Sequence, residues 1–367
     1  MDLHNLLKAL SEAPGPSGRE DATRDVIADL WRPLVDDLRT DRMGSLIGHK
    51  RGTGKSGSPP SIMAAAHMDE IGLVVTGIEG EFVRIHSLSG MDRRTVLGAE
   101  VGVHTRHVHT RHVESDEASG YRVLPGVIGS RPPHVLPASE RQNIPPWHEL
   151  FVDLGLTADE VQQWVQVGDH VTIQQPLITL RNGRIAGKAL DNRASVAALT
   201  MALDSLSRRQ HEWDFFAVAT VQEESGIKGA ITSAYGVAPT LAVALDVTFA
   251  KQHNDNDPGS FELDKGPTLG VGPNFHPELV SRLRQAAEAE EIAFTIEPLP
   301  GSSGTDAWGI QLVREGIPVG LISIPVRYMH QPVETAALRD VERAGRWLAS
   351  FVATLEPDYR PRWEDEL

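Results

Sequence analysis

Short apolar runs alternate with amphipathic helical patterns over most of this 367-residue chain, and this alternation restricts its fold more than any other feature. Four of the runs have the length and composition of buried strands. Strands that alternate with helices indicate an α/β domain with a mixed, largely parallel sheet flanked by helices. We expect strands at 62–66, 215–221, 241–245 and 318–324, and helices at 193–206, 277–290 and 338–355.

Two further helices are expected before the first of these strands. The leucines within residues 3–10 recur at the spacing of one helix face, and the apolar residues within 26–34 do the same. Ser17 and Glu20 have the spacing of a capping box, which would begin the second helix. The stretch 51–61 is rich in Gly, Ser, Lys and Pro and is expected to form a loop.

Residues 72–176 have a different texture, with short Val- and Ile-containing runs separated by Gly, Pro and Asp. No long helical pattern interrupts these runs before residues 157–165. This pattern is typical of a small all-β, barrel-like domain. We therefore expect a discontinuous α/β domain of residues 1–71 and 177–367 with this β domain inserted. Its expected strands include 80–86, 123–128 and 170–173.

Within the inserted segment the five residues His-Thr-Arg-His-Val at 104–108 are repeated at once at 109–113. The four histidines could form a metal-binding tract. Alternation along a strand would send some of them to opposite faces, and a tandem duplication explains their number. We therefore interpret the repeat as a lengthened hairpin or loop. The histidines concerned are His104, His107, His109 and His112.

Composition excludes several classes of partner and site. The formal net charge of −15 argues against nucleic acid and anionic membranes as partners, because both would repel the chain. The chain has no cysteine, so any metal site must use His, Asp and Glu. We find no secretory signal at the N-terminus and no apolar stretch near the roughly 20 residues that span a bilayer. A cytoplasmic protein is expected.

Histidines and carboxylates stand where several expected strands end. His67, Glu224 and Asp246 each end or closely follow a separate strand. Asp191 lies just before a helix, and His330 follows the last strand after a short loop. Ligands of open α/β sheets bind at the carboxyl ends of strands, so these side chains are expected to converge. Two imidazoles and three carboxylates suit zinc, with cobalt or manganese as alternatives.

Five ligands exceed one tetrahedral site and fit two ions about 3.5–4 Å apart that share a carboxylate. Glu223, beside Glu224, is placed to act as the general base that such a pair requires. Asp69, two residues beyond His67, is placed to hold the imidazole in the required tautomer. Each residue alone also fits a structural role, such as a helix N-cap for Asp191. Their coincidence at strand ends favours the metal site.

The candidate residues stand in four distinctive segments. These are Ala-His-Met-Asp-Glu-Ile-Gly at 66–72, Gly-Lys-Ala-Leu-Asp-Asn-Arg at 187–193, Gln-Glu-Glu-Ser-Gly at 222–226 and Arg-Tyr-Met-His at 327–330. Together they closely resemble the tetrahedral-aminopeptidase family, also called the glutamyl-aminopeptidase or cellulase-M-like family of dinuclear metallopeptidases. Further matches lie at 10–18, 126–129, 132–134 and 304–307, so the resemblance runs in the family's order from near the N-terminus to about residue 335.

The resemblance implies a role for each candidate residue. His67 and His330 would be terminal ligands, one on each metal, and Asp191 the bridging carboxylate. Glu224 and Asp246 would complete the two coordination spheres. It also implies that Glu223 is the general base and that Asp69 orients His67.

The family fold is a zinc-exopeptidase-like α/β domain interrupted by a β-barrel-like dimerisation domain. The resemblance therefore implies that residues 72–176 mediate dimerisation and that the chain is a homo-oligomer, either a dimer or a dodecamer. The doubled His-Thr-Arg-His-Val element departs from the expected family pattern, and it lies in this inserted domain.

The sequence thus predicts an aminopeptidase that acts on peptides with two divalent metal ions per subunit. A deacylase or carboxypeptidase with the same dinuclear site is an alternative that the ligand set leaves open. Glycoside hydrolysis by paired carboxylates needs no metal and normally uses an aromatic-lined site, whereas aromatic residues make up only 5% here. A non-enzymatic protein with a structural metal would have no use for the extra acid Glu223.

Overall fold

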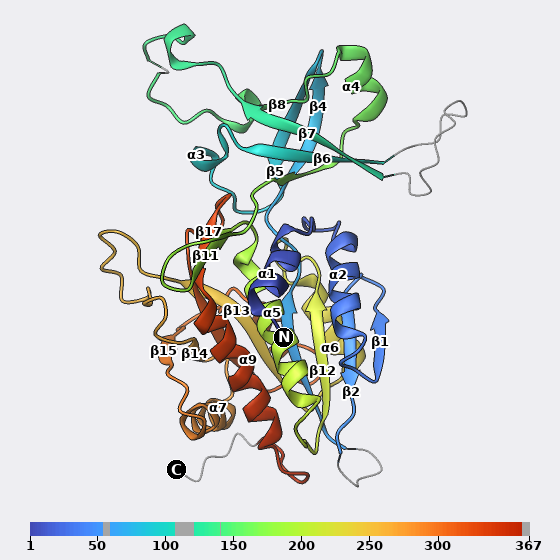
Figure 1. The fold of residues 1–367 in the computed structure, drawn as a ribbon, viewed down its shortest axis with the longest axis vertical. Helices are drawn as coiled ribbons and strands as arrows, with labels where there is room; N and C mark the ends of the chain where they lie inside the picture. The colour runs from blue at the N-terminus through green and yellow to red at the C-terminus, as the bar shows by residue number, and fades with distance from the viewer. Residues whose placement is uncertain (54–58, 107–120, 140, 362–367) are drawn as a thin grey trace, which may run out of the picture. The chain divides into compact units, whose positions relative to one another are not determined.

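The computed structural model describes residues 1–53, 59–106, 121–139 and 141–361. The chain forms two compact units, which we describe separately (Figure 1). The larger unit comprises Met1–Glu70, Pro176–Met329 and Val333–Leu367. The smaller unit comprises Ile71–Gln175 together with His330–Pro332.

An eleven-stranded mixed sheet forms the centre of the larger unit. Its central strands β12, β3, β13 and β16 run parallel, and the strands toward both edges pair antiparallel. The order across the sheet is β1-β2-β12-β3-β13-β16-β17-β11-β10, with β14 pairing β15 and β16. The bounds are β1 Asp37–Thr40, β2 Leu46–Lys50, β3 Ser61–His67, β10 Ile178–Thr179, β11 Arg184–Gly187, β12 Asp214–Thr220, β13 Leu241–Phe249, β14 Thr268–Val271, β15 Thr295–Pro298, β16 Val319–Arg327 and β17 Glu334–Ala337.

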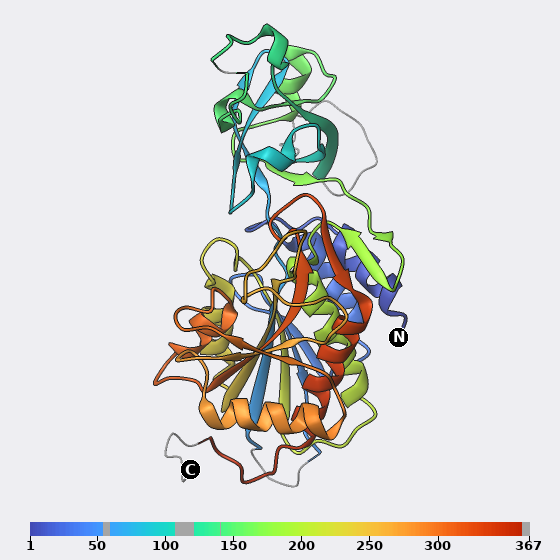
Figure 2. The ribbon, with the colours of Figure 1, turned by 90° about the vertical axis from the view of Figure 1, so that its left-hand side faces the viewer.

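Helices cover both faces of this sheet (Figure 2). One core lies between the sheet and α1, α2, α5, α7 and α9, and it includes the fully buried Trp31 and Trp347. The opposite core lies under α6 and α8. The bounds are α1 Leu3–Glu12, α2 Asp21–Trp31, α5 Leu190–Leu206, α6 Lys228–Val237, α7 Pro277–Ala289, α8 Asp306–Gln311 and α9 Leu338–Ala353.

Small apolar side chains let the central strands pack tightly between the two helical layers. All but the first residue of β3 are buried, as expected for a strand covered on both faces. The parallel register aligns the strand ends: His67 pairs with Thr220 of β12. On the other side Ala65 pairs with Ala244, two residues before His67 and Asp246 respectively. This register places His67 and Asp246 at the same level, where β3 ends.

The smaller unit is a closed antiparallel barrel in the order β4-β5-β8-β7-β6-β9. Its interior is filled by apolar side chains, including Val83, Val103, Val152 and Val171. The expected mixed α/β fold with an inserted all-β barrel is therefore confirmed. The bounds are β4 Leu73–Glu79, β5 Phe82–Ser87, α3 Arg93–Val96, β6 Glu100–Arg106, β7 Tyr121–Gly129, η1 Pro133–Val135, η2 Trp147–Glu149, β8 Phe151–Asp153, α4 Ala158–Trp164 and β9 His170–Ile173.

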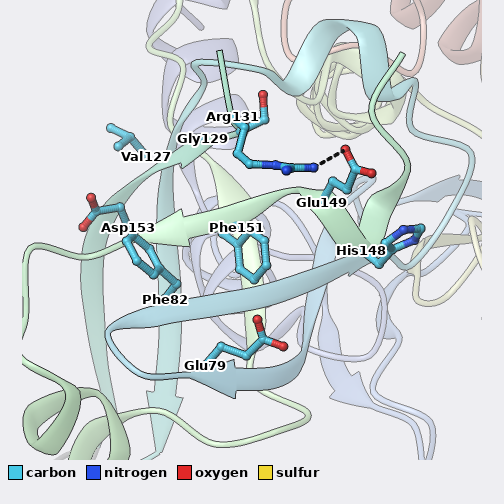
Figure 3. A pocket seen from close by; sticks show the side chains of 10 residues that line it. Glu79, Phe82, Val127, Gly129, Arg131, His148, Glu149, Phe151 and Asp153 are labelled. Carbon is cyan, nitrogen blue, oxygen red and sulfur yellow. Dashed lines mark ion pairs between the residues drawn. The ribbon is translucent and has the colours of Figure 1, made fainter. Parts of the chain in front are cut away.

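A pocket of about 600 Å³ lies against the outer face of this barrel (Figure 3). Phe82 and Phe151 form its apolar floor, with their ring centroids 6.3 Å apart in an edge-on arrangement. Arg131 and Glu149 form an ion pair of 3.9 Å at its rim, drawn as the dashed line in Figure 3. None of the described pocket residues belongs to a group of potential metal ligands. The candidate catalytic site lies elsewhere.

Several local expectations need correction. The strand expected from residue 80 begins only at Phe82, because Gly80 has a φ of 61° and forms the turn between β4 and β5. Strands β1 and β2 were not expected. Of the tandem repeat, residues 104–106 belong to β6, and 107–113 lie outside the described residues. His104 is buried and its Nε2 lies 2.7 Å from Thr172 Oγ1, which is a structural role.

Within the described residues, no helix has both the length and the apolar character needed to span a membrane.

Candidate metal centre

Three predicted ligands meet where the central strand β3 ends. His67, Asp191 and Asp246 are all buried, and one ligand atom from each lies within 4.8 Å of the others. His67 Nε2 is 3.1 Å from Asp191 Oδ1 and 3.8 Å from Asp246 Oδ1. The three side chains come from the end of β3, the start of α5 and the middle of β13. One imidazole and two carboxylates that converge in this way form a donor set suited to a divalent cation.

The backbone around Asp191 is held apart from the regular helix that follows it. Asp191 has φ −78° and ψ 103°, and its peptide bond to Asn192 is cis. Its amide donates a hydrogen bond of 2.8 Å to Glu334 Oε2. Asn192 Nδ2 donates one of 3.0 Å to the carbonyl of Leu245. Bonds to β17 and β13 therefore fix the direction of the Asp191 carboxylate.

Asp69 lies against His67 and is itself firmly held. His67 Nδ1 lies 3.1 Å from the Asp69 carbonyl oxygen and 3.4 Å from Oδ1, which leaves Nε2 directed at Asp191 and Asp246. The Asp69 carboxylate accepts hydrogen bonds from the amides of Glu223 at 3.0 Å and Glu224 at 3.2 Å. An acid that fixes the tautomer and ring orientation of a histidine is typical of metal sites.

Glu223 projects into the same cluster. Its Oε2 lies 3.9 Å from His67 Nε2, and its side chain is 10% exposed. Burial raises the pKa of Glu223 to about 10, although His67 lowers it, and nearby Asp246 raises it further. Burial likewise raises the pKa of Asp246. Buried carboxylates this close together repel one another, and a divalent cation between them would favour their ionised forms.

His67 completes the electrostatic picture. Burial lowers the pKa of its imidazole, but hydrogen bonds to Asp191 and Asp69 outweigh burial and hold the pKa well above its usual range. A cationic imidazole and a divalent metal compete for the same carboxylates, and a metal that binds would displace the imidazole proton. In this way the donor set fits a metal ion in chemistry as well as in position.

Asp191 also approaches Glu224, with one oxygen of each carboxylate within 4.8 Å of the other. The Asp191 carboxylate thus lies near His67 and Asp246 as well as near Glu224. His330 lies three residues beyond β16, has a φ of 61° and groups with the smaller unit. The larger unit therefore brings together six of the seven predicted site residues, and the ligand role of His330 stays a prediction.

The expected capping box at Ser17 and Glu20 is wrong. Glu20 is the N-cap residue of α2, and its side chain makes no capping bond. The Ser17 hydroxyl donates instead to Asp69 Oδ2. Glu20 Oε1 accepts from the amides of Gly18 at 2.7 Å and Gln222 at 3.1 Å, and burial raises the pKa of Glu20 to about 7. Both residues support the site from the N-terminal segment.

Asp306, the first residue of α8, was not assigned a role from the sequence. Its side chain is buried, and its Oδ2 accepts a hydrogen bond of 2.6 Å from Thr220 Oγ1. Thr220 is the strand partner of His67. Burial raises the pKa of Asp306 to about 6, while His67 lowers it. Only the family-like segment 304–307 pointed to this residue, and that segment carried no chemical assignment.

Glu70 is occupied by a separate buried ion pair. Lys188 Nζ lies 2.7 Å from Glu70 Oε2, and the amide of Gly15 donates to Oε1 at 2.9 Å. The fully buried Arg193 is 4.0 Å from the same carboxylate. Glu70 therefore does not serve as a second free acid beside Glu223, which counts against the glycosidase alternative.

Known proteins share this architecture and sequence. The profile of the M42 glutamyl aminopeptidase family matches residues 44–346. A lysyl aminopeptidase of Pyrococcus furiosus is 34% identical, over 97% of this chain and 99% of its own length. An aminopeptidase of the archaeon Desulfurococcus kamchatkensis matches with a TM-score of 0.86 and 36% identity, covering 97% of this chain and 96% of its own.

The Pyrococcus horikoshii TET1 peptidase, which can assemble into a tetrahedron or a large octahedral shell, matches with a TM-score of 0.80. It is 29% identical, and the match covers 96% of this chain and 100% of the peptidase. The resemblance found in the sequence is thus confirmed by family profile, identity and fold. This chain belongs to the M42 glutamyl aminopeptidase family.

Proposed function

We propose that this protein removes N-terminal residues from peptides with two divalent metal ions and Glu223 as the general base. The observation that carries the proposal is the convergence of His67, Asp191 and Asp246 within 4.8 Å, with Glu223 3.9 Å from His67. Family membership supplies the reaction class, and this cluster supplies residues suited to it.

The ligands proposed for the two ions are His67, Asp191, Glu224, Asp246 and His330, with Asp191 shared. Zinc is the first candidate, and cobalt and manganese accept the same donors. The ions would polarise the scissile carbonyl and lower the pKa of the attacking water. Asp191 suits the shared position because its carboxylate lies within reach of both His67 and Glu224.

Glu223 would take a proton from the attacking water and return it to the leaving amine. Its side chain is largely shielded from solvent and fixed at the backbone by the bond from its amide to Asp69. The Asp69 carboxylate also faces Nδ1 of His67. Asp69 would therefore set the positions of a ligand and of the base together.

The substrate must present a free α-amino group, which is cationic at neutral pH. Glu223 and Asp306 add two largely buried carboxyl groups to the surroundings of the cluster, and in their ionised forms these would favour a cation beside it. An N-acetylated peptide lacks this charge. We expect it to bind poorly and to be cleaved slowly.

We also propose that the chain assembles with copies of itself, because its Pyrococcus horikoshii relative forms closed shells. The inserted β domain, residues 72–176, is proposed to mediate dimerisation in keeping with the family resemblance.

The proposal is tested with a panel of aminoacyl-p-nitroanilides and their N-acetylated counterparts. Chelator-treated protein is assayed with zinc, cobalt or manganese restored. Release from free-amine substrates only, and only with metal, is the expected result. Release of acetate from the acetylated compounds, without release of p-nitroaniline, would instead indicate a deacylase. Release of C-terminal residues from N-blocked peptides would indicate a carboxypeptidase.

A further inference from the structure

Two neighbouring helices of the larger unit expose a group of large apolar side chains. Ile231 and Tyr235 stand one helical turn apart on α6, and Trp308 and Leu312 stand one turn apart along α8 and its C-cap. Tyr235 is 61% exposed and Leu312 is 69% exposed. We call these four residues the α6/α8 surface.

The two helices pack closely at Gly309, and a hollow lies between their exposed faces. Gly309 allows close approach, because a Cβ at this position would lie 2.9 Å from Ile231 and 2.7 Å from Ile227. The resulting hollow has a volume of about 390 Å³. It is lined by Ile231, Thr232, Tyr235, Gly309, Leu312, Val313 and Arg314.

The residues that line the hollow differ in charge from the chain as a whole. None of the seven lining residues is a carboxylate, and one is a cation, whereas the chain has a formal net charge of −15. Arg314 lies over the Tyr235 ring at 4.4 Å and donates a hydrogen bond of 2.6 Å to the Tyr235 carbonyl. Aromatic and arginine side chains are enriched at protein–protein interfaces, and acidic side chains are depleted there.

We propose that the α6/α8 surface is a contact between larger units of neighbouring copies of this chain. The inference rests on the self-assembly proposed above. A two-fold contact alone gives a dimer, and a head-to-tail contact alone gives a ring or an open filament. A tetrahedral or octahedral shell therefore needs at least two different contacts per copy. The β-barrel is proposed to supply one of them, and the α6/α8 surface supplies another.

A second copy as the partner also explains why no carboxylate lines the hollow. Two chains of the same strong negative charge repel each other over most of their surfaces. Contact is favoured where acids are missing and apolar area can be buried. The α6/α8 surface combines this apolar area with a hollow lined without acids.

The test compares assembly mass for wild-type protein, Leu312→Glu and the matched control Ile178→Glu, by size-exclusion chromatography with light scattering. Ile178 is also exposed, at 46%, but lies on the edge strand β10 of the same unit. We expect wild type and control to form the same large assembly, and Leu312→Glu to fall at least twofold in mass. Tyr235→Glu provides a second variant in case Leu312→Glu fails to fold.

An unchanged mass in both folded surface variants would overturn the proposal. So would a mass loss in Ile178→Glu of the same size, or a wild-type protein no larger than a dimer. Hydrolysis of aminoacyl-p-nitroanilides is measured on the same samples. Wild-type protein that assembles but never cleaves these substrates would refute the proposed activity and leave the contact standing. If the protein is active but neither substitution changes its assembly mass, the proposed contact is refuted and the proposed activity stands.

Discussion

The Asp69 carboxylate accepts a hydrogen bond of 3.0 Å from the backbone amide of Glu223. The same carboxylate lies 3.4 Å from Nδ1 of His67. One acid on the loop after β3 therefore connects a proposed ligand at the end of β3 with the proposed base in the loop after β12. Any change in Asp69 acts on both at once.

Replacing Asp69 with Asn should reduce kcat by at least 100-fold. An amide cannot accept as many hydrogen bonds as a carboxylate, so the bonds to the Glu223 and Glu224 amides and to His67 cannot all be kept. The effect is expected in kcat more than in KM, because Asp69 is fully buried and acts through His67 and Glu223. Steady-state kinetics on an aminoacyl-p-nitroanilide measure both constants.

Asp340→Asn is the matched control for this variant. Asp340 is also buried and accepts from two backbone amides, those of Asp264 and Gly266, but it lies at the start of α9. It should lower the unfolding temperature and leave kcat within about twofold of wild type. Normal kcat in a folded Asp69→Asn protein would contradict the positioning role.

Glu20 should make the stability of the protein depend on pH. Burial raises its pKa in the folded state to about 7 from an ordinary value of 4.5, so the folded protein holds this proton more tightly than the unfolded chain does. The resulting stability is present below pH 4.5 and is lost as the pH rises through 7. Glu20→Gln keeps an oxygen acceptor for the Gly18 and Gln222 amides but does not titrate.

Urea unfolding of wild type and Glu20→Gln at pH values from 5 to 8 measures this effect. The free energy of unfolding of wild type should fall relative to the variant by as much as about 3 kcal/mol across this range, since one pKa unit corresponds to about 1.4 kcal/mol. Other titrating groups act on both proteins and cancel in the difference. A difference that stays constant with pH would show that Glu20 keeps an ordinary pKa.

The buried pair of Lys188 and Glu70 should be more costly to break than to remove. Lys188→Met leaves the Glu70 carboxylate buried without its closest cation and should destabilise the protein by about 3 kcal/mol. Adding Glu70→Gln removes the unpaired negative charge and should recover at least half of the lost free energy of unfolding. Urea unfolding of the two single variants and the double variant gives the comparison. Independent, additive losses would contradict the coupling.

Local sequence patterns were sufficient for the main layers and for the approach of His67 to Asp246. The apolar runs of β3 and β13 are long enough to identify buried strands, and parallel pairing then places Asp246 level with His67 at the end of β3. Strand β13 continues to Phe249, beyond the expected end at residue 245. The approach of Asp69 to His67 follows from their separation of two residues. These inferences need only the strand directions and the rule that ligands gather at carboxyl ends.

Other features depend on partners far away in the sequence. The spacing of Ser17 and Glu20 is that of a capping box, but their partners Asp69 and Gln222 are 52 and 202 residues distant. Asp306 gave no chemical signal, because its position beside Thr220 exists only after α8 packs on the sheet. Strand β1 was missed because it lies at the sheet edge and is mostly exposed, without an apolar run.

The most direct test of the account is activity measured against bound metal for wild type and Glu223→Gln. Each protein is stripped with chelator, reloaded stepwise, and assayed on an aminoacyl-p-nitroanilide while bound ions per chain are counted by mass spectrometry. The account predicts that wild-type activity rises with bound ions to two per chain. Glu223→Gln should bind the same number and lose at least 1000-fold in kcat, because a neutral amide cannot accept the proton. Full activity of the metal-free protein, or wild-type kcat in metal-loaded Glu223→Gln, would contradict the account.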